Sequence, residues 1–497
     1  MNKLLILVLL ISIAPANALA KKVTIDIGEV IGFEKYGIQH FLGVPYAQAP
    51  IGELRWQPPV PINKFVKPVD ASSYGDICVQ PGAKPDLNMS EDCLNLNIWT
   101  ANTKAKLPVM VWFHGGGFKT GSNRILGTTF AAKGAVVVAL NYRLGPLGFF
   151  AHPELKLSSV NPGVLDMVAG LKWVKENISH FGGDANNITL FGVSAGGMAV
   201  NLMATNKAAN GLFHKAIAQS GYATWPLPRT SGETISPNSI SAEKVAIDLI
   251  TKISPDTNYN KTQLLDLSAT KLVNAVEGFV LPIVDGESVE EEPGIVFLKG
   301  EQNDISLVTG GNSFEGSVMP YSGVSDDAYI NLLSDDYQNI RKHYDVYTGV
   351  PESLIHQLMW GENRYLLSAY VTANAMARQS KNAWLYYVDF VPEEYKGKTL
   401  GTTHGSDAQM LWSGQFSANT EIKAVSLRLQ NYWFNFAKLG TPTQTPENKG
   451  NPHWLRLNKT SIPWLLIGRT DRLGPLSIIE RLKLFEDNYK QRIQPLL

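Results

Sequence analysis

Ser194 has the surroundings that point most directly to covalent chemistry. It lies in the segment GVSAG (192–196), directly after an apolar run, 188–191, that is typical of a buried strand. A sharp turn from strand to helix would hold the hydroxyl exposed and strained. Glycine is needed at 192 and 196 because a side chain there would meet neighbouring backbone. Ser194 is therefore predicted to be a nucleophile.

A nucleophilic serine needs hydrogen-bond donors for the negative charge that develops on the oxygen of the attacked group. The segment HGGGF (114–118) follows the apolar run 109–113. Three glycines in a row indicate main-chain N–H groups that approach something closely. In an α/β-hydrolase arrangement, this loop and the residue after the serine supply the donors. We expect Gly116, Gly117 and Ala195 to form an oxyanion hole and His114 to shape the loop.

Several long segments resemble the type-B carboxylesterase family, which also contains the cholinesterases. FGGDANNITLFGVSAG resembles the nucleophile signature of that family, and SEDCLNLNIW resembles its second signature. Further matching segments follow in order along most of the chain, at 41–59, 141–150, 281–286 and 432–443. The resemblance implies an α/β-hydrolase fold, a serine esterase that cleaves carboxylic esters through an acyl-enzyme, and no cofactor.

The resemblance also implies a base and an acid for the serine. A serine hydroxyl needs a base within hydrogen-bonding reach, and the base needs a partner that fixes its tautomer. Among nine histidines, His404 alone lies in a glycine-flanked loop after an aromatic strand, and it matches the catalytic histidine of the family. Glu315, in NSFEG, resembles the acidic member, with Asp285 as the alternative. The order Ser194, Glu315, His404 is that of α/β-hydrolases.

The residue before the nucleophile departs from the family pattern. Many members carry glutamate there, whereas this chain has Val193. The absence of that carboxylate lowers the expectation of a cationic substrate. Asp407, three residues after His404, is a candidate to replace it in part. The alternative is that Asp407 only caps or hydrogen-bonds its loop.

The two cysteines, Cys78 and Cys93, can join in an oxidising compartment, and the resemblance places a disulfide at the same position. The loop between them contains no aromatic residue, although cholinesterases use one there to bind quaternary ammonium. This argues against a choline ester substrate. Two cysteines without nearby histidines also give no reason to expect a metal site.

Four residues near the catalytic segments are candidates for an acyl or alcohol pocket, although a plain core role fits each equally well: Tyr222, Trp225, Phe314 and Met319. Two alternatives to a general esterase stay open. One is a specialised hydrolase of a lactone, a carbamate, or a bulky aromatic or polyol ester. The other is a non-catalytic binding or adhesion protein of the same fold, since some family members lack the nucleophile.

The N-terminus has the pattern of a secretory signal peptide, with Lys3, an apolar core at 4–13, and Ala-Leu-Ala before Lys21. We expect cleavage after Ala20 and export to the periplasm or the extracellular space. No later apolar run is long enough for a transmembrane helix. Forty-four basic and 44 acidic residues balance, which gives no reason to expect attraction to nucleic acid or membrane surfaces. We therefore expect a small-molecule partner, and the resemblance implies that it is an ester. The oligomeric state stays open.

One catalytic domain, 21–497, is the economical interpretation, because the catalytic segments spread from 115 to 404. Short apolar strands alternate with helical patterns, which predicts an α/β fold: a mostly parallel twisted sheet flanked by helices. The expected strands are 109–113, 136–140, 188–191, 216–219, 305–309 and 385–390. Two mostly helical stretches, about 239–277 and 326–380, lie between catalytic loops and are expected to wall the active-site gorge.

Overall fold

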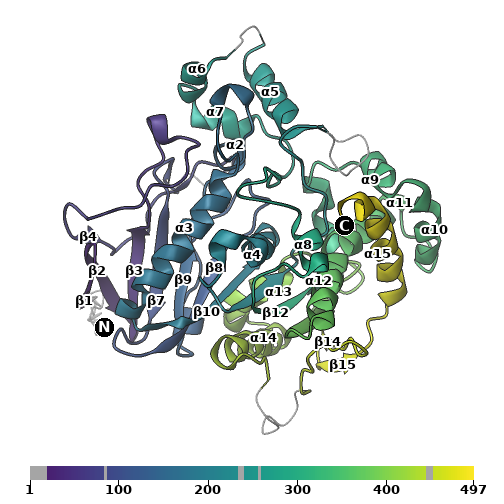
Figure 1. Ribbon diagram of the computed structural model, residues 1–497. Coiled ribbons are helices and arrows are strands. Elements are labelled where there is room, and N and C mark those ends of the chain that lie inside the picture. Colours follow the sequence, from purple (N-terminus) through teal and green to yellow (C-terminus); the bar gives the residue numbers. More distant parts are fainter. Residues whose placement is uncertain (1–18, 83–86, 233–239, 256–258, 444–451) are drawn as a thin grey trace, which may run out of the picture.

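The computed structural model describes residues 19–82, 87–232, 240–255, 259–443 and 452–497. One large twisted sheet runs through the molecule (Figure 1). The order of its strands across the sheet is β1, β2, β3, β7, β9, β8, β10, β11, β12, β13, β14 and β15, and β4 pairs with β2 outside this order. The strands are β1 (Leu19–Ile25), β2 (Gly28–Lys35), β3 (Ile38–Pro45), β4 (Val69–Asp70), β7 (Asn95–Thr100), β8 (Leu107–Phe113), β9 (Val136–Leu140), β10 (Gly183–Val193), β11 (Lys215–Gln219), β12 (Ser306–Asn312), β13 (Ala383–Val388), β14 (Trp464–Ile467) and β15 (Arg472–Gly474). A separate short pair joins β5 (Ile77–Cys78) to β6 (Met89–Ser90).

The seven strands from β9 through β14 run parallel to one another, and the strands at both edges of the sheet are antiparallel. The six expected strands all lie in this parallel part. Strand β9 matches its predicted bounds, whereas β13 begins at Ala383 and ends at Val388, two residues earlier than predicted. Strand β10 is longer than predicted, because Gly183 pairs with Leu107 beyond an irregularity in register.

The parallel strands are apolar throughout because both faces of the sheet are covered. In β8, Val109, Val111 and Phe113 pack into one core cluster, and Met110 and Trp112 pack into another. The first cluster includes side chains of α3 (Pro162–Asn177), α4 (Ala195–Thr205), α8 (Pro293–Lys299) and α12 (Leu367–Arg378). The second includes α1 (Thr128–Ala131), α13 (Ser406–Ser413) and α14 (Thr420–Leu439). The α/β-hydrolase fold is therefore confirmed, with helices on both faces.

The two predicted helical stretches form separate groups of helices at the carboxyl-end side of the sheet (Figure 1). The first group contains α5 (Ala242–Ile253), α6 (Lys261–Leu265) and α7 (Ala269–Asn274), and it lies next to α2 (Gly145–Gly148). The second contains α9 (Asp326–Leu333), α10 (Tyr337–Arg341), α11 (Glu352–Gly361) and a π-helical turn, η8 (Glu362–Leu366), that leads into α12. The two groups line a shared cavity of about 780 Å³, to which α5 contributes Val245 and α9 contributes Ala328.

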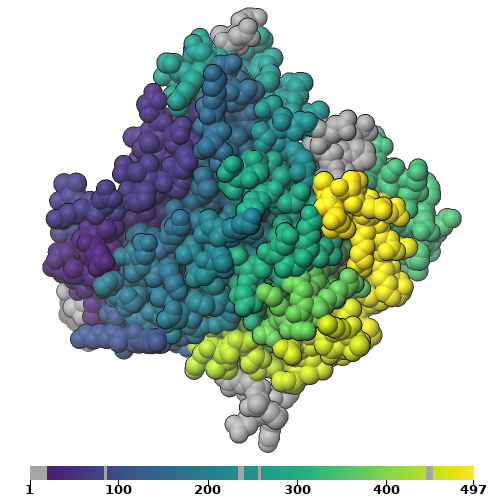
Figure 2. Space-filling model, viewed as in Figure 1, coloured from purple at the N-terminus to yellow at the C-terminus, as the bar shows by residue number. Residues whose placement is uncertain are grey.

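The ends of the described chain lie on opposite sides of the molecule. In the space-filling view, the N-terminal strands are at the left and the C-terminal helix α15 (Ile479–Ile493) is at the right (Figure 2). Residues 1–18 lie outside the described part, so the signal-peptide prediction stays a prediction. Among the described residues, no helix is long and apolar enough to cross a bilayer.

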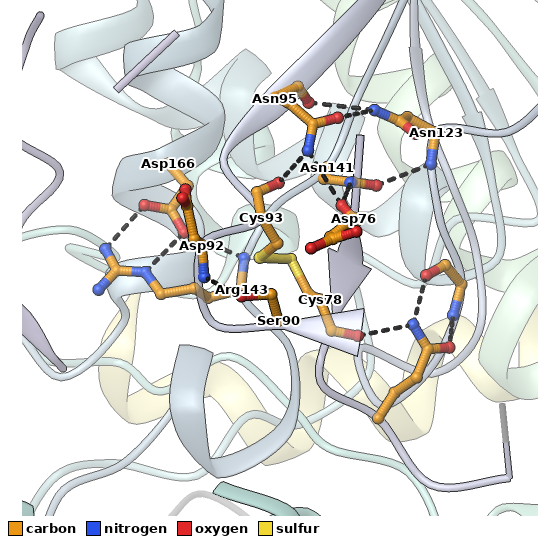
Figure 3. The surroundings of a disulfide bond; sticks show 12 residues. Asp76, Cys78, Ser90, Asp92, Cys93, Asn95, Asn123, Asn141, Arg143 and Asp166 are labelled. Atoms are coloured by element: carbon orange, nitrogen blue, oxygen red, sulfur yellow. Dashed lines mark hydrogen bonds and ion pairs between the residues drawn. A yellow bond between two sulfur atoms is a disulfide. The ribbon is translucent and has the colours of Figure 1, made fainter. Parts of the chain in front are cut away.

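Cys78 and Cys93 form the disulfide that the resemblance implied, with their Cα atoms 5.0 Å apart (Figure 3). Buried asparagines tie this region to the sheet. Asn95 Nδ2 donates to the carbonyl of Cys93 (3.1 Å), and Asn123 Nδ2 donates to Asn95 Oδ1 (2.9 Å). Gln80, just after Cys78, exchanges two hydrogen bonds of 2.8 Å with the backbone of Gly121. The disulfide region therefore supports the loop that follows the glycine run.

We predict that the double variant Cys78→Ser, Cys93→Ser unfolds with a free energy lower by about 3 kcal/mol. A cross-link over 15 residues restricts the unfolded chain by about this amount. Urea unfolding followed by fluorescence measures the difference, and wild-type protein kept in reductant should lose a similar amount. Equal stability of the oxidised, reduced and serine forms would contradict the prediction.

Candidate active site

Ser194 occupies the sharp turn between β10 and α4. Its backbone has φ 60° and ψ −120°, which is strained for a residue other than glycine. The N–H of Ser194 donates to the carbonyl of Gln219 (2.9 Å), which holds the turn against the end of β11. A Cβ on Gly196 would lie 2.1 Å from the carbonyl oxygen of Phe113, and one on Gly192 would lie 2.6 Å from the same atom. The predicted need for glycine on both sides of the serine is therefore confirmed.

The glycine loop lies directly against this turn. A Cβ on Gly115 would be 3.3 Å from Cβ of Ser194. Gly116 and Gly117 adopt φ of 112° and 63°, so both use backbone conformations that favour glycine. Within the described residues, the N–H groups of Gly116, Gly117 and Ala195 donate no hydrogen bond. These three donors stand free beside the serine, at the N-terminal end of α4, whose helix dipole favours negative charge.

Glu315 and His404 are in direct contact. Nδ1 of His404 donates to Oε2 of Glu315 in a short hydrogen bond. The loops that carry them run side by side, because Phe314 and Thr403 form a parallel bridge and the N–H of His404 donates to Ser317 Oγ (2.9 Å). With Nδ1 protonated, Nε2 is left as the acceptor nitrogen of the ring.

The other oxygen of Glu315 receives three hydrogen bonds that fix the carboxylate. Ser220 Oγ donates to Oε1 (2.6 Å), and Asn312 donates to it through both its backbone N–H (2.6 Å) and Nδ2 (3.2 Å). Sequence reasoning missed Ser220 and Asn312. Their only signal was position, since they follow or end the parallel strands β11 and β12, whose carboxyl ends meet at one edge of the sheet.

Ser194 is linked to the Glu315–His404 pair through the end of β11. The carbonyl of Gln219 accepts a hydrogen bond from the N–H of Ser194, and the next residue, Ser220, donates one to Glu315. Nε2 of His404 is buried and has no hydrogen-bond partner among the described residues. Ser194 Oγ is therefore not hydrogen-bonded to it in this structure. Such contacts are often long in unliganded enzymes and tighten when substrate binds.

The remaining acidic candidates have structural contacts. Asp285 accepts hydrogen bonds from Ser159 Oγ (2.9 Å), Asn161 Nδ2 (3.1 Å) and several N–H groups of its own turn, and no histidine contacts it. Asp407 is fully buried and accepts from Gln219 Nε2 (2.9 Å), Tyr386 Oη (2.7 Å) and Asn312 Nδ2 (3.1 Å). Asp407 is therefore connected to Glu315 through Asn312, and among the described hydrogen bonds none joins Asp407 to the imidazole of His404.

The family is settled by comparison with known proteins. The model of the carboxylesterase family matches residues 19–483. Para-nitrobenzyl esterase of Bacillus subtilis (strain 168) is 33% identical over 458 residues, which cover 86% of this chain and 91% of that protein. The chain belongs to the carboxylesterase family. It is a carboxylic ester hydrolase.

Other relatives agree with this assignment. Fumonisin B1 esterase of Sphingopyxis macrogoltabida is 30% identical over 469 residues, covering 87% of this chain and 84% of that protein. A solved PNB esterase superposes with a TM-score of 0.78 at 29% identity, covering 94% of this chain and 99% of that one. A carboxylesterase from Geobacillus stearothermophilus superposes with a TM-score of 0.79 at 26% identity, covering 93% and 99%.

The four predicted pocket residues of this carboxylesterase are all buried, but they lie in different surroundings. Trp225 lines the 780 Å³ cavity, and Tyr222, Phe314 and Met319 do not. Phe279, which sequence reasoning missed, also lines that cavity and contacts the glycine loop, since a Cβ on Gly117 would lie 2.4 Å from its ring. No cluster of metal-ligating side chains is present among the described residues.

His114 is buried beneath the glycine loop and packs against Tyr142. Its ring stacks on Tyr142, with centroids 4.3 Å apart, and Tyr142 Oη donates to its carbonyl (2.6 Å). Burial lowers the pKa of His114 to about 4, so the ring is neutral at pH 7. This neutral, packed histidine fits the predicted shaping role.

The lowered pKa of His114 makes the stability of this carboxylesterase fall in acid. The unfolded chain takes up a proton below about pH 6.5 and the folded chain only near pH 4, so stability is lost as pH falls through this window. A shift of this size corresponds to about 3 kcal/mol. We predict that His114→Asn flattens the loss of unfolding free energy between pH 6.5 and 4, as measured by urea unfolding. The exposed His180→Asn control should keep the wild-type slope, and an unchanged slope in His114→Asn would contradict the assignment.

Proposed function

We propose that this carboxylesterase cleaves its ester through a covalent acyl-enzyme on Ser194, with His404 as base and Glu315 as its partner. The observation that carries the proposal is the contact between Glu315 Oε2 and His404 Nδ1, which leaves Nε2 as the ring nitrogen available to act as the base. The strained serine turn and the three free N–H groups beside it support the same assignment.

In the acylation step, Nε2 of His404 takes the proton of Ser194 as Oγ attacks the ester carbonyl carbon. Glu315 stabilises the imidazolium and keeps the ring oriented. The carbonyl oxygen becomes negatively charged and accepts hydrogen bonds from the N–H groups of Gly116, Gly117 and Ala195. The absence of another hydrogen bond from these N–H groups among the described residues supports this role, because no existing bond has to break when the charge develops.

Collapse of the tetrahedral intermediate breaks the bond to the alcohol, which leaves with the proton from His404. A water molecule then gives a proton to Nε2 and attacks the acyl carbon, and a second oxyanion forms in the same three-donor site. Release of the acid returns the proton to Ser194. Each step uses the same groups, so removal of any one of them affects both halves of the reaction.

We predict that Ser194→Ala lowers kcat for p-nitrophenyl esters by about 10⁴-fold or more, because no other group can form the acyl-enzyme. Rates should be measured on a panel of acyl lengths, since a steep fall beyond butyrate would indicate a closed acyl pocket. Ser413→Ala, an exposed serine on α13, is the matched control and should keep wild-type rates.

Covalent labelling provides an independent test of the same proposal. A fluorophosphonate should label wild-type protein on Ser194, and peptide mapping by mass spectrometry locates the adduct. Wild-type protein that carries no adduct and hydrolyses no ester would contradict the mechanism and favour a binding role.

We also propose that residues 1–20 direct export and that the mature catalytic domain spans 21–497. Removal of the first 20 residues would take two residues from β1 and would leave Lys21 to Ile25 paired with β2. We predict that protein recovered from the periplasm or the medium begins at Lys21, as checked by N-terminal sequencing and intact mass. Protein confined to the cytoplasm with an intact N-terminus would contradict the proposal.

A further inference from the structure

Arg364 is a buried cation held among aromatic rings. It lies in the π-helical turn η8 and is only 2% exposed. Its Cζ lies 4.1 Å from the ring centroid of Tyr222, 4.5 Å from that of Trp225, 5.3 Å from that of Trp360 and 5.6 Å from that of Tyr365. We call these four rings and Arg364 the arginine cage.

Aromatic rings cover the faces of the guanidinium, and its Nε is buried without a hydrogen-bond partner among the described residues. Aromatic rings attract the flat faces of the cation, whereas its N–H groups point outward in the plane and require hydrogen-bond acceptors. Nε of Arg364 has no partner, and no carboxylate lies within 4.0 Å of its nitrogens among the described residues. Glu362, two residues away, is already taken by Arg481 (2.6 Å) and by Tyr344 Oη (2.6 Å).

Other donors of the cage also lack acceptors. Among the described residues, Nε1 of Trp360 is buried without a hydrogen-bond partner, and the buried hydroxyls of Tyr222 and Tyr365 interact with Arg364 while their O–H groups donate to no acceptor. Burial raises the pKa of Tyr222 to about 12 against the opposing effect of Arg364, so this hydroxyl keeps its proton. The cage therefore combines one positive charge with several neutral donors, a set that suits an anion.

The cage adjoins the catalytic pair. The ring of Tyr365 lies 4.6 Å from the ring of His404, and the rings of Tyr222 and Tyr365 are 5.9 Å apart. Tyr222 follows Ser220, which binds Glu315, by two residues. Trp225 lines the large cavity as well as the cage. An anionic group held at the cage would therefore be separated from His404 by one aromatic ring, that of Tyr365.

We propose that Arg364 binds a carboxylate carried by the ester substrate, so that this carboxylesterase prefers esters with a free acid group. The inference rests on the proposed function and names its substrate class. Burial of an unpaired guanidinium is costly, and an apolar side chain would fill the same space without that cost. A carboxylate can accept two parallel hydrogen bonds from a guanidinium, as a neutral substrate group does not.

The carboxylate has two possible places in the substrate, and two pairs of compounds distinguish them. Monoethyl adipate against ethyl hexanoate tests a carboxylate on the acyl side. 4-(Acetoxymethyl)benzoate against 4-methylbenzyl acetate tests one on the alcohol side. The measured quantity is the ratio of kcat/KM for the acidic ester to that for its neutral partner, followed in a pH-stat.

In one of the two pairs, wild-type protein should give a ratio above about 10. Arg364→Met should lower that ratio about 30-fold, because a charge-assisted hydrogen bond to the substrate carboxylate is lost. The change should come mainly from a higher KM for the acidic ester. Arg364→Lys should fall between the two. Arg428→Met, which removes an arginine on α14 that pairs with Asp471, is the matched control and should keep the wild-type ratio.

A ratio that is unchanged in Arg364→Met would overturn the inference, as would wild-type ratios near 1 in both pairs. If Arg364→Met does not fold, the wild-type ratios alone decide. The proposed function is tested separately by the neutral esters. Suppose that the neutral esters are hydrolysed and Ser194 is labelled, but neither acidic ester is preferred over its neutral partner. This result would contradict the proposed carboxylate site and would still support the proposed mechanism.

Discussion

The hydrogen bond from the amide of Ser194 to the carbonyl of Gln219 is the contact on which the catalytic geometry depends. It fixes a strained serine at the end of a central strand. The same strand end places Ser220 against Glu315, and the side chain of Gln219 donates to Asp407 and accepts from Trp433 Nε1 (3.1 Å). Two consecutive residues therefore position Ser194, which is the proposed nucleophile, Glu315, which is the proposed acid, and the polar network behind Glu315.

Close packing and cross-links between loops constrain the proposed site. Each glycine around the serine turn lies against backbone atoms, so the turn has no room to relax. Phe314 and Thr403 join the acid and histidine loops, and Gln80 joins the disulfide region to the segment after the glycine run. Fixed N–H donors are what electrostatic stabilisation of a transient oxyanion requires, and a fixed carboxylate is what orients an imidazole and stabilises its protonated form.

The parallel core and the acid–base pair could be predicted from the sequence, and their surroundings could not. Strands that are covered on both faces of a sheet have continuous apolar sequences. The run VVVAL therefore predicted β9 with the correct first and last residues. The N-terminal antiparallel strands were missed because their residues alternate between buried and partly exposed positions, as in β2, and no long run marks them. Glu315 was predicted because the short segment NSFEG resembles the acidic loop of the family, and His404 because its glycine-flanked loop follows an aromatic strand and matches the catalytic histidine of the family. Ser220, Asn312 and Arg364 carry no such signal, because their importance arises from neighbours that are distant in the chain.

The separation between the sheet and the two helical groups has a consequence for how substrate range can change. The chemistry depends on strand ends and short loops, whereas the wall of the large cavity comes from α5 and α9, which belong to segments inserted between those loops. Lengthening, shortening or exchanging an insertion leaves the ladder hydrogen bonds of the core intact. Such modularity lets one reaction centre serve many differently shaped esters, and it makes the insertions the natural place for directed evolution to act.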